Sequence, residues 1–272
     1  MILSKYIAHL QENFFANRSD ALEFASHATG VSYYNLSTHM SEEVTTIPNA
    51  EEELARVKSG EPLAYVLNNK NFYGEDFYVD ESVLIPRPET ELLVEHALDI
   101  TPEMRKIRIL DICTGSGCIL TTLLMNLPEA IGVGLDISDD ALKTAQINLE
   151  KHCVADRATL VQGDALEINT LDLGTFDLIT CNPPYLSDDE WEGSDKSLKY
   201  EPKIALSSGV DALLFYKKLM DMTPDLCNKN GGVLFEIGMG QYGALIRAGY
   251  AEKYHVTKDY QHIERVLSWI NL

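Results

Sequence analysis

Residues 107–117 read Ile-Arg-Ile-Leu-Asp-Ile-Cys-Thr-Gly-Ser-Gly, a largely apolar stretch that runs directly into a glycine-rich turn. Its length and its bounding glycines predict a buried strand. A helix-forming segment follows at 117–127, and a second apolar strand is predicted at 131–137. Ser138 is a suitable N-cap for another helix, which runs to about residue 151. This alternation of strand and helix predicts a parallel α/β sheet.

The same alternation continues to the end of the chain. It predicts three further strands, at residues 158–162, 176–180 and 232–237, and one helix at residues 210–222. Two last strands, at 254–260 and 264–270, follow each other closely and are expected to be antiparallel. The predicted fold class is therefore α/β, with a mostly parallel sheet and an antiparallel last strand.

The first sixty residues have a different pattern, with apolar residues at helical spacing. Residues 71–83 are then rich in aromatic and β-branched residues around Gly74, which predicts a short hairpin. Pro88, in a two-proline loop, is suited to the first turn of a helix that reaches about residue 99. The sequence thus predicts three parts: a helical domain at 1–62, a hairpin linker at 63–84 and an α/β domain at 85–272.

The composition of the chain excludes or disfavours several classes of function. With 42 acidic and 22 basic residues the net charge is −20, which disfavours non-specific binding to phosphate backbones. The five cysteines include no Cys-x-x-Cys pair, and no histidine stands at metal-ligand spacing, so no metal is predicted. The N-terminal residues are charged and no segment is apolar enough for a membrane span. A cytoplasmic protein is expected.

A cofactor site is predicted at the end of the first strand. The glycines of residues 113–117 let the backbone turn tightly, so that a ligand can approach amides at a helix N-terminus. Asp136, at the end of the next strand, can accept hydrogen bonds from two ribose hydroxyls. A nicotinamide cofactor is disfavoured because Leu120 replaces the third glycine of Gly-x-Gly-x-x-Gly. A sulfonium cofactor needs no pyrophosphate cradle and is favoured by nearby carboxylates such as Asp111.

The third strand ends before Asp164 and Ala165. Because ligands of open parallel sheets bind at the carboxyl ends of strands, Asp164 is expected on the same edge as Asp111 and Asp136. There it can accept a hydrogen bond from an exocyclic amine of adenine. A strand-end aspartate can equally cap the following helix.

The fourth strand leads to Asn182-Pro183-Pro184-Tyr185. Asn182 and the carbonyl of Pro183 are two hydrogen-bond acceptors, and Tyr185 offers a flat face for a planar group. Together they can take both hydrogens of an amide or amino nitrogen and direct its lone pair at a methyl donor. No general base is needed, because the methylated nitrogen becomes acidic and loses its proton afterwards. This tetrad predicts methylation of a planar nitrogen.

The sequence resembles the class I S-adenosylmethionine-dependent methyltransferases, and specifically the peptide chain release factor glutamine N5-methyltransferase family (HemK/PrmC type). The matching segments are residues 85–91, 109–117, 177–185, 200–211 and 231–241. The helical N-terminal part and the hairpin match as well. The resemblance implies a Rossmann-like class I sheet, S-adenosylmethionine as the cofactor and an N-terminal domain that recognises the substrate.

The family's site residues carry over by position. Implied cofactor contacts are Cys113, Thr114, Gly115, Ser116, Gly117, Asp136, Asp164, Ala165 and Asn182. Implied substrate contacts are Asn182, Pro183, Pro184 and Tyr185, of which Asn182, Pro183 and Tyr185 are the catalytic group. No metal ligand is implied.

Three departures from the family pattern stand out. Cys113 replaces the usual first glycine, and we expect its φ to be negative. Ala165 lacks the aromatic side chain that some members place beside adenine. Residues 259–265 replace a Gly-x-Asp-Arg pattern, so the distal edge of the sheet is expected to differ.

The implied substrate is the glutamine of the Gly-Gly-Gln loop in class-1 release factors, whose basic surroundings would suit an acidic enzyme. A monomer without a stable nucleic-acid partner and without a membrane is expected. The alternatives are a ribosomal-protein glutamine methyltransferase and a nucleic-acid amino-methyltransferase (adenine N6 or guanine N2). In the ribosomal-protein family a Ser-Pro replaces the Pro-Glu-Thr of residues 88–90, and the net charge disfavours the nucleic-acid enzymes. A regulatory binding module is disfavoured by the intact tetrad.

Overall fold

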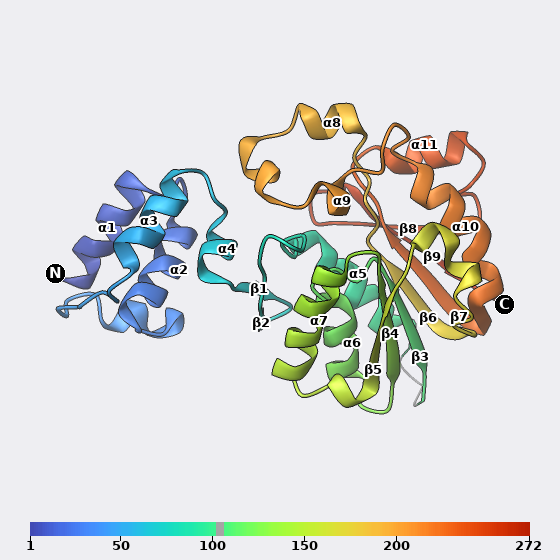
Figure 1. Ribbon diagram of the computed structural model, residues 1–272, viewed down its shortest axis with the longest axis horizontal. Helices are drawn as coiled ribbons and strands as arrows, with labels where there is room; N and C mark the ends of the chain where they lie inside the picture. Colours follow the sequence, from blue (N-terminus) through green and yellow to red (C-terminus); the bar gives the residue numbers. More distant parts are fainter. Residues whose placement is uncertain (102–105) are drawn as a thin grey trace. The chain divides into compact units, whose positions relative to one another are not determined.

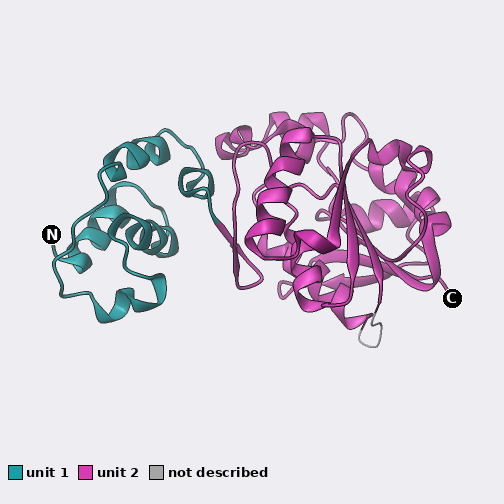
Figure 2. Ribbon diagram, turned by 60° about the horizontal axis from the view of Figure 1, so that its bottom comes forward, with its two compact units in different colours: residues 1–69 teal, residues 70–272 magenta. Residues whose placement is uncertain are grey.

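The computed structural model describes residues 1–101 and 106–272, which divide into two compact units, Met1–Asn69 and Lys70–Leu272 (Figures 1 and 2). Each unit has a buried apolar core of its own. The assignment of functions to residues 1–62, 63–84 and 85–272 stays a prediction.

The first unit is helical, as its apolar spacing predicts. Its elements are α1 (Leu3–Asn13), α2 (Arg18–Thr29), the 3₁₀ helix η1 (Tyr33–Thr38), α3 (Ala50–Lys58) and α4 (Leu63–Leu67). Asn17 caps α2 by accepting a 2.8 Å hydrogen bond from the amide of Asp20. Leu3, Leu10 and Phe24 are fully buried in its core. The two short helices η1 and α4 were not predicted.

The second unit begins with the predicted hairpin, which is confirmed. β1 (Lys70–Phe72) and β2 (Glu75–Phe77) pair antiparallel across a tight turn. The turn residues Tyr73 and Gly74 both have positive φ, 54° and 80°, as a two-residue hairpin turn requires. Phe72 and Phe77 are buried and meet edge to face.

A seven-stranded sheet forms the centre of this unit, in the order β5-β4-β3-β6-β7-β9-β8 (Figure 1). The strands are β3 (Arg108–Ile112), β4 (Ile131–Asp136), β5 (Ala158–Gln162), β6 (Phe176–Cys181), β7 (Cys227–Glu236), β8 (His255–Lys258) and β9 (Glu264–Ile270). β3 to β7 are parallel, and β9 pairs antiparallel with both β7 and β8. The predicted fold class is confirmed, including the antiparallel last strand.

Helices cover both faces of the sheet, because side chains of successive strand residues point to opposite faces. Ile109 belongs to the core beneath α5 (Pro88–Asp99), α6 (Cys118–Asn126) and α7 (Asp139–Lys151). Leu110 belongs to the opposite core, beneath η3 (Ala165–Thr170), α10 (Leu214–Leu226) and α11 (Gln241–Arg247). The shorter helical elements are η2 (Ala155–Arg157), α8 (Asp188–Glu192), η4 (Lys196–Tyr200) and α9 (Lys203–Leu206).

The helix predicted at 210–222 has different bounds. Gly209 has a φ of 88°, and a carboxylate oxygen of Asp211 accepts a 2.9 Å hydrogen bond from the amide of Leu213. This turn delays the start of α10 to Leu214, and the helix continues to Leu226. None of the helices among residues 1–101 and 106–272 has the length and apolar character needed to cross a membrane.

Candidate active site

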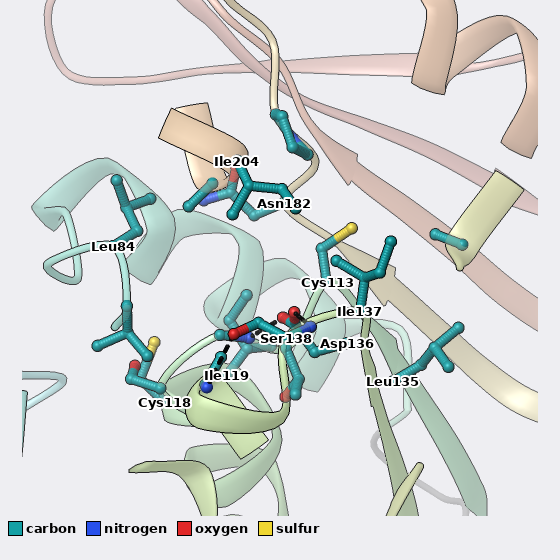
Figure 3. Close-up of a pocket in the computed structure, with 18 of the residues that line it drawn as sticks. Leu84, Cys113, Cys118, Ile119, Leu135, Asp136, Ile137, Ser138, Asn182 and Ile204 are labelled. Carbon is teal, nitrogen blue, oxygen red and sulfur yellow. Dashed lines mark hydrogen bonds between the residues drawn. The ribbon is translucent and has the colours of Figure 1, made fainter. Parts of the chain in front are cut away.

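A cavity opens at the carboxyl ends of β3, β4, β5 and β6 (Figure 3). Most residues that the sequence implied as cofactor or substrate contacts line it: Cys113, Thr114, Gly115, Ser116, Asp136, Asp164, Ala165, Asn182 and Pro184. Gly117, Pro183 and Tyr185 are not among the lining residues. This placement follows from sheet topology, since parallel strands end at one common edge.

The loop between β3 and α6 is held by hydrogen bonds from its backbone amides to residues of β4. The amide of Thr114 donates to the carbonyl of Leu135 at 3.0 Å, and the amide of Gly115 donates to the carboxylate of Asp136 at 2.9 Å. Cys113 has a φ of 59°, so the expectation of a negative φ was wrong. A left-handed non-glycine residue costs roughly 1–2 kcal/mol. The bonds that Thr114 and Gly115 make directly after it offset that cost.

Gly117 supports the loop without facing the cavity. It has a φ of 74°, and a Cβ built on it would lie 3.0 Å from the Cβ of Ala145 in α7. The position therefore needs glycine both for its backbone conformation and for the close approach of α6 and α7. Its role is structural in this arrangement.

Asp136 combines a structural and a pocket-facing role. Its two carboxylate oxygens accept hydrogen bonds from the amides of Gly115 and Ser138, at 2.9 and 3.0 Å. An ionised carboxylate has about four acceptor positions, so capacity remains for hydroxyl donors in the cavity. Burial raises the pKa of Asp136, and the backbone hydrogen bonds oppose that shift.

Asp111 differs from its predicted surroundings, whereas Asp164 lies at the predicted edge of the sheet. Asp111 is fully buried within the sheet and does not line the cavity; it accepts hydrogen bonds from the hydroxyls of Thr114 and Thr180, at 2.6 and 2.8 Å. Burial raises its pKa to about 6. Asp164 does line the cavity, and one of its oxygens caps η3 by accepting from the amide of Leu166 at 2.8 Å. The helix-cap alternative is confirmed for that oxygen.

Asn182 presents an acceptor without a partner. Its Nδ2 donates to the hydroxyl of Thr90 at 3.3 Å, while its Oδ1 is buried with no hydrogen-bond partner among the described residues. A buried polar atom of this kind is costly unless a ligand satisfies it. Tyr185 is anchored by its backbone, since its carbonyl accepts from Gln241 at 2.8 Å. Burial raises the pKa of the Tyr185 phenol to about 12.

A buried carboxylate joins two walls of the cavity. Glu201 accepts hydrogen bonds from the amide of Ile85 at 3.0 Å and from the guanidinium of Arg87. Glu201 is buried, and Arg87 is itself a lining residue. The loop before α5 is thereby tied to the segment that carries Ile204, which Figure 3 shows above the cavity near Asn182.

Thr90, Glu201 and Glu236 were not predicted from the sequence as site residues. All three lie in segments that carry the family resemblance, and that resemblance is the feature of the sequence that could have pointed to them. Among residues 1–101 and 106–272, no group of three histidine, cysteine or acidic side chains is arranged to hold a metal ion.

Comparisons with known proteins agree with this geometry. Residues 103–225 match the family described as "Methyltransferase domain". The release factor glutamine methyltransferase of Chlorobaculum tepidum is 38% identical over 220 residues, which are 77% of this chain and 74% of that protein. The enzyme of the same description from Thermodesulfovibrio yellowstonii is 35% identical over 271 residues, 96% of this chain and 95% of that protein.

Two solved structures show the same fold at low sequence identity. A methyltransferase from Pyrococcus furiosus has a TM-score of 0.52 at 18% identity, over 81% of this chain and 98% of that one. The hMettl16 catalytic domain, solved in complex with MAT2A 3′UTR hairpin 1, has a TM-score of 0.58 at 16% identity, over 97% and 90%.

The sheet order, the glycine loop and the cavity at the carboxyl edge are those of a methyltransferase. Within that class, the identity and the nearly complete coverage decide the family. The chain belongs to the release factor glutamine methyltransferase family.

Proposed function

We propose that this enzyme transfers the methyl group of S-adenosylmethionine to the side-chain N5 nitrogen of the glutamine in the Gly-Gly-Gln loop of class-1 peptide chain release factors. The observation that carries the proposal is the buried, unpartnered Oδ1 of Asn182 on the wall of the cavity. An amide NH₂ group is a ligand that would satisfy this acceptor.

The cavity residues fit the cofactor. Asp136 retains acceptor capacity for ribose hydroxyls, and Leu135, Ile137 and Ala165 provide apolar walls for a base. Asp164 stands beside Ala165, where its carboxylate can accept from an exocyclic amine. When bound, the cofactor supplies an electrophilic methyl group on a sulfonium centre.

The residues of the tetrad prepare the nucleophile. Asn182 Oδ1 and the carbonyl of Pro183 each accept one hydrogen of the substrate amide, which localises the nitrogen lone pair. Pro184 stiffens the backbone and contributes no N–H that would compete for these acceptors. Tyr185 supports the planar amide with its ring. Fixing the nitrogen in line with the methyl donor supplies most of the rate enhancement.

The helical residues 1–62 form the second contact surface for the release factor in this proposal. Removing residues 1–69, which make up a compact unit with its own core, should raise the KM for the release factor at least about tenfold, equivalent to about 1.4 kcal/mol. Cofactor affinity should stay within about twofold, because every residue that lines the cavity belongs to the other unit. Steady-state kinetics and calorimetry check this, and an equal loss of both affinities would contradict it.

The enzyme acts in the cytoplasm as a monomer in this proposal. It has no stable nucleic-acid partner, because its net charge of −20 opposes binding to phosphate backbones. Incubation with methyl-labelled cofactor and three acceptors in parallel tests the substrate class: a release factor, a ribosomal-protein mixture and total RNA. Label should enter the release factor. Preferential label in RNA at low salt would favour a nucleic-acid amino-methyltransferase, and label in a large-subunit protein would favour the ribosomal-protein enzyme.

A further inference from the structure

Residues 78–87, which we call the strap, form one wall of the cavity. They lie between β2 and α5 and belong to no helix or strand. Figure 3 shows Leu84 of the strap beside the cavity. The strap residues that line the cavity are Ser82, Val83, Leu84, Pro86 and Arg87. A segment without secondary structure needs other contacts to hold it in this place.

Asn148, on α7, holds the strap through its side-chain amide. Its Oδ1 accepts a 2.7 Å hydrogen bond from the amide of Tyr78, and its Nδ2 donates to the carbonyl of Tyr78 at 2.9 Å. Because β2 ends at Phe77, the Asn148 amide takes the place of a strand that would pair with Tyr78. Nδ2 also donates to the carbonyl of Ser116 at 2.8 Å. One side chain thereby joins the strap to the glycine loop on the opposite wall.

The three hydrogen bonds fix the orientation of the Asn148 amide, because they use both of its N–H groups and its oxygen. An amide turned the other way would set its oxygen against two carbonyls and its NH₂ group against an N–H. Asn148 is fully buried, so water cannot replace a lost bond. The two partners lie 70 and 32 residues away in the sequence, so none of these bonds supports α7 itself.

A second polar side chain of α7 supports the strap one turn earlier. Thr144 is buried, and its hydroxyl lies 3.1 Å from the hydroxyl of Ser82, which lines the cavity. The carboxylate of Asp80 accepts from the amide of Ser82 at 3.0 Å, which shapes the strap at this point. Residues four apart on a helix share a face, so Thr144 and Asn148 both face the strap. α7 is therefore a common support for two walls of the cavity.

We propose that Asn148 is a positioning residue for cofactor binding, which holds the strap and the glycine loop in the arrangement that S-adenosylmethionine requires. The inference rests on the cofactor of the proposed function and is independent of the methyl acceptor. Walls that are already in place need not be ordered when the ligand binds, and this raises affinity. Asn148 does not line the cavity, so its effect reaches the ligand through Ser116 and the strap.

Asn148→Leu removes all three hydrogen bonds at similar side-chain volume. The apparent Kd for S-adenosylhomocysteine should rise at least about tenfold, because a cavity that is complete only part of the time loses affinity in proportion. The kcat at saturating cofactor should fall by less than about threefold, since the bound ligand restores the arrangement. Leu149→Ala is the matched control, because Leu149 is the next residue of α7 and is buried in the apolar core. It should lower the Tm but leave the Kd within about twofold.

Calorimetric titration with S-adenosylhomocysteine and hydrogen exchange of the strap test the proposal together. In the free enzyme, peptides of residues 78–87 should exchange faster in Asn148→Leu than in the wild type or in Leu149→Ala, and bound S-adenosylhomocysteine should remove most of that difference. An unchanged Kd in Asn148→Leu, or an equal rise in Leu149→Ala, would overturn the proposal.

Asn148→Ser keeps a polar group at this position and serves if Asn148→Leu does not fold. Its hydroxyl is too short to bridge both partners, so the Kd should again rise, and a wild-type Kd would overturn the proposal. The acceptor is tested separately. A wild-type enzyme that binds S-adenosylhomocysteine but does not label a release factor would sink the acceptor assignment of the proposed function and leave the role of Asn148 intact.

Discussion

Replacing Asn182 by alanine should lower the rate of methyl transfer by at least about 10²-fold, the cost of removing one preorganised hydrogen-bonding group from a reacting centre. The affinity for cofactor should change by no more than a few-fold. The reason is that the polar contact suited to ribose comes from Asp136, at the end of β4. The Oδ1 of Asn182 is available for the acceptor amide.

Single-turnover transfer from labelled cofactor and calorimetric titration with S-adenosylhomocysteine measure the two quantities separately. Asn126→Ala is a suitable control, because its amide donates to the carbonyl of Thr122 within α6, away from the cavity. It should leave both the rate and the affinity unchanged. A comparable loss of rate and of cofactor affinity in Asn182→Ala would refute its assignment to the acceptor.

Asp136→Ala should have the opposite effect to Asn182→Ala: a large loss of cofactor affinity and a small loss of turnover at saturating cofactor. Hydrogen bonds to a charged group contribute about 1.5–3 kcal/mol each, so loss of two to the ribose should raise the Kd for cofactor by at least about 10²-fold. The substitution also removes the bond that holds the amide of Gly115, which loosens the loop. Turnover at saturating cofactor should be reduced far less than in Asn182→Ala, because Asp136 does not touch the acceptor.

Asp136→Asn should not rescue binding. Its amide nitrogen would face one of the two backbone N–H groups, of Gly115 or Ser138, that the carboxylate now accepts from. Asp140→Ala, an exposed residue of α7 paired with Lys143, controls for the loss of one negative charge. A wild-type Kd in Asp136→Ala would contradict the cofactor assignment.

Much of the site could be predicted because its residues follow parallel strands. Asp136 is the last residue of β4, Asp164 and Asn182 closely follow β5 and β6, and parallel strands end at a common edge. The hairpin could be predicted because Gly74 interrupts a run of aromatic and β-branched residues. In both cases the prediction depends on short segments of sequence. For the site, the parallel sheet then brings the ends of these segments close together.

The rest depended on contacts between distant parts of the chain. Thr90 lies 92 residues from Asn182, and Ile85 lies 116 residues from Glu201. No periodicity links such positions, so their partnership became visible only in the folded chain. Asp111 was expected at the edge with Asp136, but its bonds to Thr114 and Thr180 place it inside the sheet.

Cys113 shows how tertiary bonds override a local preference. A non-glycine residue disfavours positive φ, which is why a negative value was expected. The two amides that follow it can reach Leu135 and Asp136 on β4 only if the chain turns sharply at Cys113. Two hydrogen bonds, one to the carbonyl of Leu135 and one to the carboxylate of Asp136, outweigh the strain of one residue.

The central claim is that the substrate nitrogen belongs to one glutamine side chain. Fragmentation mass spectrometry of a release factor methylated by this enzyme tests it most directly, with the wild-type factor compared with a Gln-to-Asn variant of the Gly-Gly-Gln loop. We expect a single methyl group on the side-chain nitrogen of that glutamine and none on the variant. A methyl group on the asparagine variant, or on another residue of the wild-type factor, would contradict the assignment.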